Sequence, residues 1–232
     1  RPPRSTLFPY TTLFRSDSPD GDQGYPGALV MKVTYSLDEE NTLMIHYEAE
    51  PDQDTIINMT NHSYFNLNGH KSGDVLNHTL WLNADAFTPA DAASIPTGEI
   101  RSVEGTPMDF RTDKTIGKDI GADYEPLVFG NGYDHNWVLK NEGEFDKVAE
   151  VAGDESGIHM SVLTDLPGVQ IYTANFLDGV KGRDGAVYEM RDAICLETQY
   201  YPDAIHHENF PGPICKKGEK YDTRTAYRFR VK

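Results

Sequence analysis

The sequence has few cysteines, few basic residues and no long apolar segment. Cys195 and Cys215 are its only cysteines, too few for a disulfide framework, and no residues have the spacing of a zinc motif. Lys and Arg number 21 against 37 Asp and Glu, so the formal net charge is −16. This acidity argues against binding to nucleic acid or to an anionic membrane surface. No apolar run is long enough to span a bilayer, and the scarce cysteines favour reduced thiols and a cytoplasmic location.

The first sixteen residues contain no acid at all, unlike the rest of the chain. RPPRSTLFPYTTLFRS is rich in Arg, Ser and Thr, as organelle transit peptides are. However, TLFPYTTLFRS (6–16) resembles the translation of a DNA adapter used in short-read sequencing libraries. We therefore expect residues 1–16 to be foreign to the protein and its native sequence to occupy residues 17–232. Any targeting signal would then be missing.

Alternation of apolar and polar residues with a period of two dominates residues 17–232. MKVTYSL (31–37) and TLMIHYEAE (42–50) show it on either side of the turn-like DEEN, and together they predict a β-hairpin. Clusters of Gly and Pro separate the strands, and no segment keeps a helical apolar stripe beyond a turn or two. The fold class is therefore all-β, with one domain built as a large antiparallel β-sandwich. Further strands are expected at 157–165, 169–176 and 226–232.

Three stretches depart from this strand pattern because they concentrate polar, chemically active side chains. Each side chain also has a simpler structural interpretation. A single His is commonly structural, and an Asp before a strand often caps a turn. A Glu within an apolar strand would be costly to bury without partners, which favours a solvent-facing position. The stretches are TNHSYFNL (60–67), GYDHNWVL (132–139) and ICLETQYYPDA (194–204).

Taken together, the motifs of the chain resemble the aldose 1-epimerase (galactose mutarotase) family. They are SPDGDQGYPG, TNHSYFNL, PTGE, GYDHNWVL, PGVQIYTANFLDG and CLETQYYPDA, in the order of the family and across residues 18–232. The resemblance implies a galactose mutarotase-like supersandwich that binds a monosaccharide on its concave face, without a metal or organic cofactor. The family's N-terminal part, with an Asn-Arg pair and a second His near the sugar, has no counterpart. We therefore expect the sandwich to be incomplete at its N-terminus and this chain to be inactive as a fragment.

The resemblance also implies roles for individual residues. Opening a hexose ring requires a base that takes the proton of the C1 hydroxyl and an acid that protonates the ring oxygen, on opposite sides of the sugar. The open aldehyde then rotates about C1–C2 and recloses as the other anomer of a sugar such as galactose or glucose. His62 matches the acid, Glu197 matches the base, Asp134 and Gln170 match residues that bind sugar hydroxyls, and Ser63 and Tyr64 belong to the motif of His62.

Three other functions fit parts of the sequence. Asp134 and Glu197 could form the carboxylate pair of a glycoside hydrolase. The sandwich could also be a sugar-binding module without catalysis, since fold does not fix function. A metal site is the third, but none of the eight histidines has metal-motif spacing. The adjacent His206 and His207 would point to opposite faces of a strand, and they stand where the family leads us to expect an Asn-containing stretch at the site rim. Sugar preference and oligomeric state are not predicted.

Overall fold

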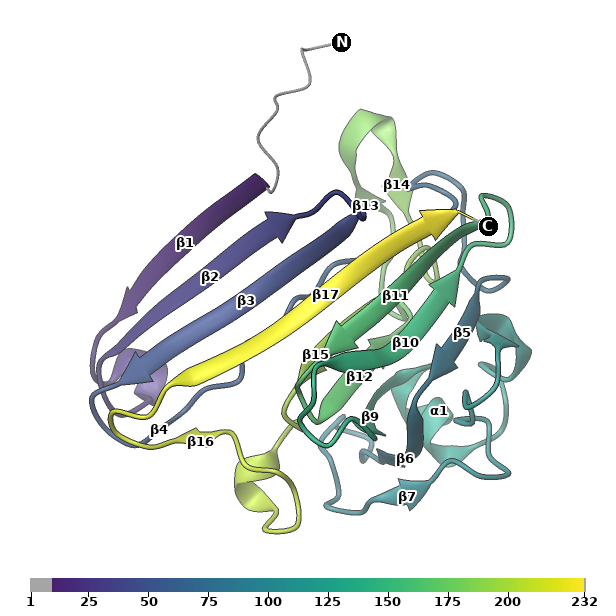
Figure 1. Cartoon of the computed structure of the whole chain (residues 1–232). Helices are drawn as coiled ribbons and strands as arrows, with labels where there is room; N and C mark the ends of the chain where they lie inside the picture. The colour runs from purple at the N-terminus through teal and green to yellow at the C-terminus, as the bar shows by residue number, and fades with distance from the viewer. Residues whose placement is uncertain (1–9, 232) are drawn as a thin grey trace.

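Antiparallel strands make up nearly all of the regular structure in the computed structural model, which describes residues 10–231 (Figure 1). The first nine residues of the segment expected to be foreign therefore lie outside the described part. Two sheets pack face to face and share one hydrophobic core, with side chains such as Ile45 and Val162 from one sheet and Ile171 and Leu196 from the other. The expected all-β sandwich is confirmed.

The larger sheet contains, in spatial order, β1 (Tyr10–Ser18), β2 (Leu29–Leu37), β3 (Thr42–Pro51), β17 (Tyr221–Val231), β11 (Ile158–Thr164), β10 (Asp146–Ala152), β5 (Thr79–Leu82) and β8 (Lys114–Thr115). The smaller sheet contains β15 (Cys195–Gln199), β12 (Gly168–Tyr172), β9 (Asp134–Leu139), β6 (Ala84–Thr88) and β7 (Arg101–Ser102). Two short ribbons pair β13 (Val180–Lys181) with β14 (Val187–Tyr188), and β4 (Thr55–Ile56) with β16 (Ile214–Cys215).

Helical structure is short and peripheral. One α-helical turn and a half, α1 (Glu125–Gly130), precedes β9. The 3₁₀ turns are η1 (Asp22–Gly24), η2 (Ile116–Lys118), η3 (Arg183–Gly185) and η4 (Ala204–His206). Among residues 10–231, no helix has the length and apolar character needed to cross a membrane.

The predicted hairpin is confirmed by the pairing of β2 with β3. Met31 lies opposite Ala49 and Val33 opposite Tyr47, so the apolar residues of both strands share the face that packs on the core. The strand predicted at 169–176 is too long, because β12 ends at Tyr172. Beyond that point Ala174 adopts a left-handed φ of 50°, and Asn175 Nδ2 donates to the carbonyl oxygen of Gly130 at 2.7 Å. These side-chain and backbone constraints turn the chain out of the sheet.

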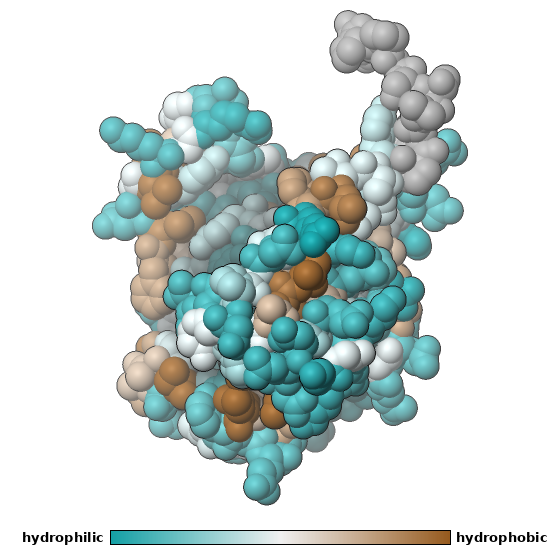
Figure 2. All heavy atoms as spheres, turned by 90° about the vertical axis from the view of Figure 1, so that its left-hand side faces the viewer, coloured by the Kyte–Doolittle hydropathy of each residue, from teal (hydrophilic) through white to brown (hydrophobic). Residues whose placement is uncertain are grey.

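The edge strand β1 is exposed along nearly its whole length. Residues 10–17 are all exposed, including Leu13 (59%) and Phe14 (58%), although β1 pairs in register with β2. Figure 2 looks onto this side of the molecule, where apolar side chains are interspersed among hydrophilic ones. A strand that covers no core face contributes main-chain hydrogen bonds but little apolar burial.

An aromatic cluster supports the start of β9 from the core side. Trp137 is fully buried, and its Nε1 donates to the carbonyl oxygen of Met108 at 3.1 Å. Tyr133 and Phe110 pack against it with ring centroids 6.1 Å away. His135 lies on the same face, and its Nδ1 accepts the backbone N–H of Asp134 at 3.1 Å. His135 is therefore a core residue, as the structural interpretation of a single His predicts.

Burial of His135 has a consequence for stability at acid pH. Desolvation lowers the pKa of His135 from 6.5 to about 4, although the backbone of Pro126 opposes this shift. As the pH falls below about 6.5, the unfolded chain takes up this proton before the folded one does, so stability is lost between about pH 6.5 and pH 4. We expect a loss of about 2 kcal/mol in the free energy of unfolding between about pH 7 and pH 5 from this group.

Urea titrations at the two pH values measure this contribution. Other groups also titrate in this range, so the readout is the comparison between variants: His135→Gln should shift the difference between pH 7 and pH 5 by about 2 kcal/mol in favour of stability at pH 5, whereas His206→Gln, at an exposed histidine, should leave the difference unchanged. An equal pH dependence in the His135→Gln protein and the unchanged protein would contradict the assignment.

Candidate active site

The strand registers of the smaller sheet build two rows of side chains on the face that points away from the core. Alternation along each strand puts residues two apart on the same face. The buried apolar face carries Leu196, Ile171 and His135 in register. The opposite face carries Cys195, Tyr172 and Asp134 in one row and Glu197, Gln170 and Asn136 in the next.

A cavity of about 430 Å³ opens over these rows. Its volume is in the range of small-molecule sites, and its lining combines carboxyl, amide, imidazole and phenol groups. The lining residues are His62, Tyr64, Asp134, Gln170, Tyr172, Phe176, Glu197, Gln199 and Pro202.

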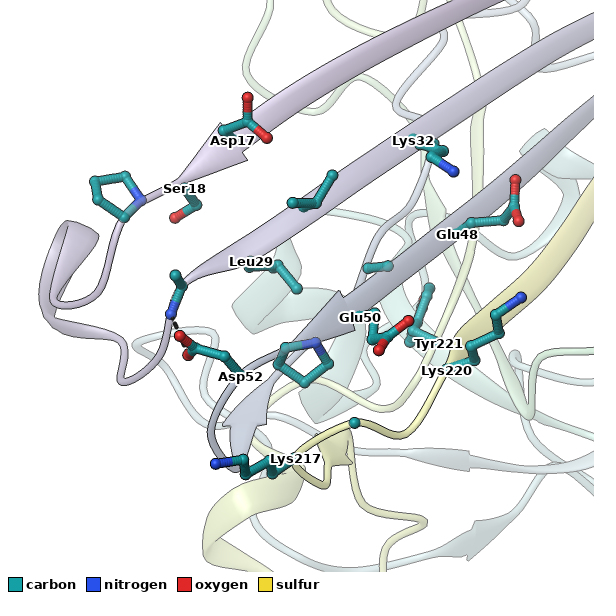
Figure 3. A pocket seen from close by; sticks show the side chains of 16 residues that line it. Asp17, Ser18, Leu29, Lys32, Glu48, Glu50, Asp52, Lys217, Lys220 and Tyr221 are labelled. Carbon is teal, nitrogen blue, oxygen red and sulfur yellow. Dashed lines mark hydrogen bonds between the residues drawn. The ribbon is translucent and has the colours of Figure 1, made fainter.

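A larger cavity of about 810 Å³ lies across β2 and β3, between the end of β1 and the start of β17 (Figure 3). Its charged side chains include Lys32 and Glu48, which face each other across the β2–β3 ladder and compensate each other. The side chain of Asp52 accepts a hydrogen bond from the backbone N–H of Ala28 at 2.7 Å. The cavity has no histidine or cysteine in its lining, so the smaller cavity is the better candidate for chemistry.

The segment that carries His62 is fastened along β15 at both ends. At one end Phe65 and Ile194 exchange two backbone hydrogen bonds of 2.9 Å. At the other end the side chain of Asn58 bonds the backbone N–H and carbonyl of Tyr200, at 2.9 and 3.1 Å. The segment therefore runs beside β15, and His62 lies next to Glu197.

His62 and Glu197 form an ion pair at the cavity, with Nε2 3.4 Å from Oε1. The His62 side chain is 50% exposed and that of Glu197 only 10%. The expectation that a Glu in this strand faces solvent is therefore wrong, because the face of β15 that carries Glu197 is covered by the His62 segment.

Burial, more than the neighbouring charges, sets the pKa of Glu197. Burial raises the pKa of Glu197 from 4.5 to about 7, the neighbouring His62 opposes the shift, and the carboxylate of Asp134 adds to it. Burial likewise raises the pKa of Asp134, against the hydrogen bond that Gln170 Nε2 donates to Asp134 Oδ1 at 2.7 Å. Glu197 is thus poised to exchange a proton near neutral pH.

Aromatic rings form one wall of the cavity. Tyr64 stacks on His62 with centroids 5.2 Å apart, and Tyr172 meets both rings edge-on at 6.1 and 6.2 Å. Such a wall offers a ligand an apolar surface beside the polar groups of the strands. It also restricts the orientation of the His62 ring.

Five of the six candidate residues from the sequence meet in this one cavity, and the sixth does not. Ser63 is half-buried outside the lining, where its backbone N–H donates to Asn61 Oδ1 at 3.2 Å. Alternation could have found two lining residues that the sequence analysis missed, since Tyr172 and Gln199 each stand two positions after a candidate. Phe176 and Pro202 lie beyond the ends of β12 and β15, so the alternation of side chains along these strands cannot indicate them.

The paired histidines are not on a strand. His206 ends η4, and both His206 and His207 contact the carboxylate of Asp203, the latter at 3.3 Å. The expectation that they point to opposite faces is wrong, because a tight turn brings both rings to one side chain. Neither lines the cavity, although Pro202 beside them does.

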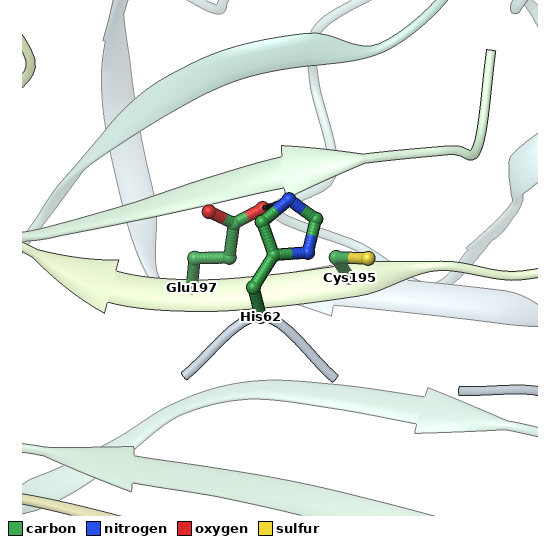
Figure 4. A group of neighbouring side chains, drawn as sticks. All are labelled: His62, Cys195 and Glu197. Atoms are coloured by element: carbon green, nitrogen blue, oxygen red, sulfur yellow. Dashed lines mark ion pairs between the residues drawn. The ribbon is translucent and has the colours of Figure 1, made fainter. Parts of the chain in front are cut away.

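One group of described residues has the composition of a metal site, namely His62, Cys195 and Glu197. Their ligand atoms all lie within 4.8 Å of one another (Figure 4). Both cysteines of the chain are free and buried.

Comparison with known proteins matches most of the chain. A model of the aldose 1-epimerase family matches residues 5–228. The galactose mutarotase of Bos taurus is 45% identical over 219 residues, which are 94% of this chain and 62% of that protein. The aldose 1-epimerase of Escherichia coli (strain K12) is 40% identical over 220 residues, 94% of this chain and 63% of that protein. The chain thus spans about three fifths of the length of these curated relatives.

Solved structures agree with the fold. A GalM/aldose epimerase homologue from C. elegans superposes with a TM-score of 0.85 at 31% identity, covering 95% of this chain and 66% of that one. The galactose 1-epimerase from Lactobacillus acidophilus NCFM superposes with a TM-score of 0.83 at 28% identity, covering 96% and 65%.

Proposed function

The chain belongs to the aldose 1-epimerase family, and on that basis we propose that it carries the acid–base site of an enzyme that interconverts the α and β anomers of hexoses such as galactose and glucose. The observation that carries the proposal is the His62–Glu197 pair at the edge of a polar, sugar-sized cavity. No other described pair combines this contact with a carboxyl group whose pKa is raised to about 7.

The proposed reaction uses these two groups on the two oxygen atoms that are bonded to C1 of the sugar. Ionised Glu197 takes the proton of the C1 hydroxyl, the C1=O bond forms, and the C1–O5 bond breaks as His62 protonates the ring oxygen. The aldehyde rotates about C1–C2. As the ring recloses, His62 takes its proton back from the C5 hydroxyl while Glu197 returns its proton to the C1 oxygen. This arrangement differs from the expectation of an acid and a base on opposite sides of the sugar. Both oxygens are bonded to C1, so an acid and a base that lie 3.4 Å apart can reach them.

The second row supplies hydroxyl-binding groups. Gln170 Oε1 is buried and has no hydrogen-bond partner among residues 10–231, while its Nε2 is held by Asp134. An unpartnered buried acceptor is costly unless a ligand satisfies it. A sugar hydroxyl that donates to Gln170 Oε1 and another that donates to Asp134 would fix the ring, and misplacement by about 1 Å costs ~10²-fold in rate.

Polarimetry tests the function. The protein expressed from the complete gene should accelerate the change in optical rotation of fresh α-D-galactose and α-D-glucose, with the 232-residue chain measured beside it. Sugar binding without acceleration in the complete protein would instead favour a non-catalytic binding module. Release of new reducing ends from a glycoside would favour a hydrolase.

We also propose that residues 1–16 are foreign to the protein and that residues 17–232 form the C-terminal part of one sandwich domain in the cytoplasm. The exposure of every residue from 10 to 17 supports a segment that did not evolve to cover this sheet. Long-read sequencing of genomic DNA across the codon for Asp17 tests whether residues 1–16 are foreign. We expect the frame to continue upstream through different codons. Native codons for RPPRSTLFPYTTLFRS would overturn the proposal. The match of the family model begins at residue 5, and this match counts in favour of native codons.

A further inference from the structure

Cys195 has no part in the proposed reaction, yet it lies against both reacting groups. It stands two residues before Glu197 on β15, so alternation directs both side chains to the cavity face. The fastening of the Asn58–Phe65 segment along β15 then brings His62 over the same two positions. Figure 4 shows the imidazole ring beside the Glu197 carboxyl group and the Cys195 thiol.

We propose that His62, Cys195 and Glu197 bind a zinc-like divalent cation, and that the bound ion inhibits the epimerase reaction. The inhibition rests on the function proposed above, whereas the binding does not. Zn²⁺ takes thiolate, imidazole and carboxylate ligands, and three protein ligands with one open position are a common set. Mg²⁺ and Ca²⁺ prefer oxygen ligands and should bind poorly.

The distances suit such an ion. When three atoms are no more than 4.8 Å apart, some point lies within about 2.8 Å of all of them. Zinc–ligand bonds of about 2.0–2.3 Å therefore require the three side chains to close in by less than ~1 Å each. His62 is half exposed and its ring can make this adjustment. The fourth position would be taken by a water molecule in the cavity.

The negative charge around the site also favours binding of a cation. The cation enters beside the carboxyl groups of Glu197 and Asp134 in a chain with a net charge of −16. As the metal–sulfur bond forms, the Cys195 thiol releases its proton to the buffer, and nothing is oxidised or reduced. The ion then occupies the lone pairs of both Glu197 and His62, so neither can accept or donate a proton to a sugar.

A spectroscopic titration of the 232-residue chain tests binding independently of activity. Cd²⁺ should bind with a stoichiometry of one and produce an ultraviolet thiolate-to-metal charge-transfer band, and Zn²⁺ should displace it. Cys195→Ser should abolish the band and weaken binding by more than ~10²-fold, since even outer-shell changes at metal sites cost 10–100-fold. Cys215→Ser removes the other free cysteine, on β16, and should leave both readouts unchanged.

Cys195→Ala serves as a second variant, and circular dichroism of each variant verifies folding. Absence of the band in the unchanged chain, or an equal band in folded Cys195→Ser, overturns the proposal. In the complete protein, Zn²⁺ should inhibit mutarotation, and removal of the ion with EDTA should restore the rate. The Cys195→Ser variant should keep its rate of mutarotation and resist inhibition by Zn²⁺. A bound ion with undiminished mutarotation overturns the inhibitory role. A complete protein that binds the ion but never catalyses mutarotation overturns the proposed function and the inhibition, but leaves the metal site established.

Discussion

Replacing Glu197 with Gln should lower the rate of mutarotation by about 10²–10⁴-fold while galactose binding remains measurable. The amide has nearly the shape of the carboxyl group and can still hydrogen-bond a hydroxyl, but it cannot take the C1 proton. Polarimetry of the complete protein gives the rate, and isothermal titration calorimetry gives the affinity. Glu208→Gln, at an exposed carboxylate outside the cavity, is the matched control and should leave the rate within about twofold.

The same substitution should also stabilise the fold at higher pH. Glu197 is buried and its pKa is raised to about 7, so the folded state disfavours the ionised form. A group whose pKa is raised on folding costs stability as the pH rises through that value. Glu197→Gln should therefore have the higher free energy of unfolding above about pH 7.

The rate and affinity measurements also have contradicting outcomes. An unchanged rate of mutarotation in Glu197→Gln would exclude Glu197 as the base. Loss of galactose binding together with the rate would make Glu197 a ligand of the sugar.

Local strand pairs of the sandwich could be predicted from sequence, but the meeting of remote segments at the site could not. Alternation in MKVTYSL and TLMIHYEAE is enough to predict a hairpin, because both strands are local and each has one face on the core. Whether the face that carries Glu197 is covered depends on a neighbour that is remote in sequence. The backbone bridge between Phe65 and Ile194 and the hydrogen bonds of Asn58 with Tyr200 hold that segment beside β15.

The same reasoning explains which site residues the sequence could not indicate. The group of His62, Cys195 and Glu197 does not have the spacing of a metal-binding motif. Cys195 and Glu197 lie on β15, whereas His62 lies on a remote segment that the Phe65–Ile194 bridge holds beside this strand. Phe176 lies beyond the left-handed turn at Ala174, which ends β12 for reasons that involve Gly130 and Asn175. Family resemblance supplied the candidate residues, and registers and long-range bonds give their arrangement.

The pH dependence of catalysis should carry the signature of Asp134. We expect kcat/KM to fall on the acid side of about pH 7, because the base must be ionised and the pKa of Glu197 lies there. Asp134→Asn removes a negative charge that raises this pKa. The acid limb of the profile should therefore move to lower pH, even though the variant is less active overall.

The loss of activity at the plateau comes from sugar binding. Asn at position 134 cannot offer a charged acceptor, and a hydrogen bond to a charged group contributes about 1.5–3 kcal/mol, so kcat/KM at high pH should fall by about 10- to 100-fold. Asp123→Asn, at an exposed carboxylate beside α1, should change neither the plateau nor the limb. Initial rates from polarimetry between about pH 5 and pH 9 separate the two effects. A plateau loss without movement of the acid limb would mean that the Asp134 charge does not act on the base, and the raised pKa of Glu197 would then arise from burial alone.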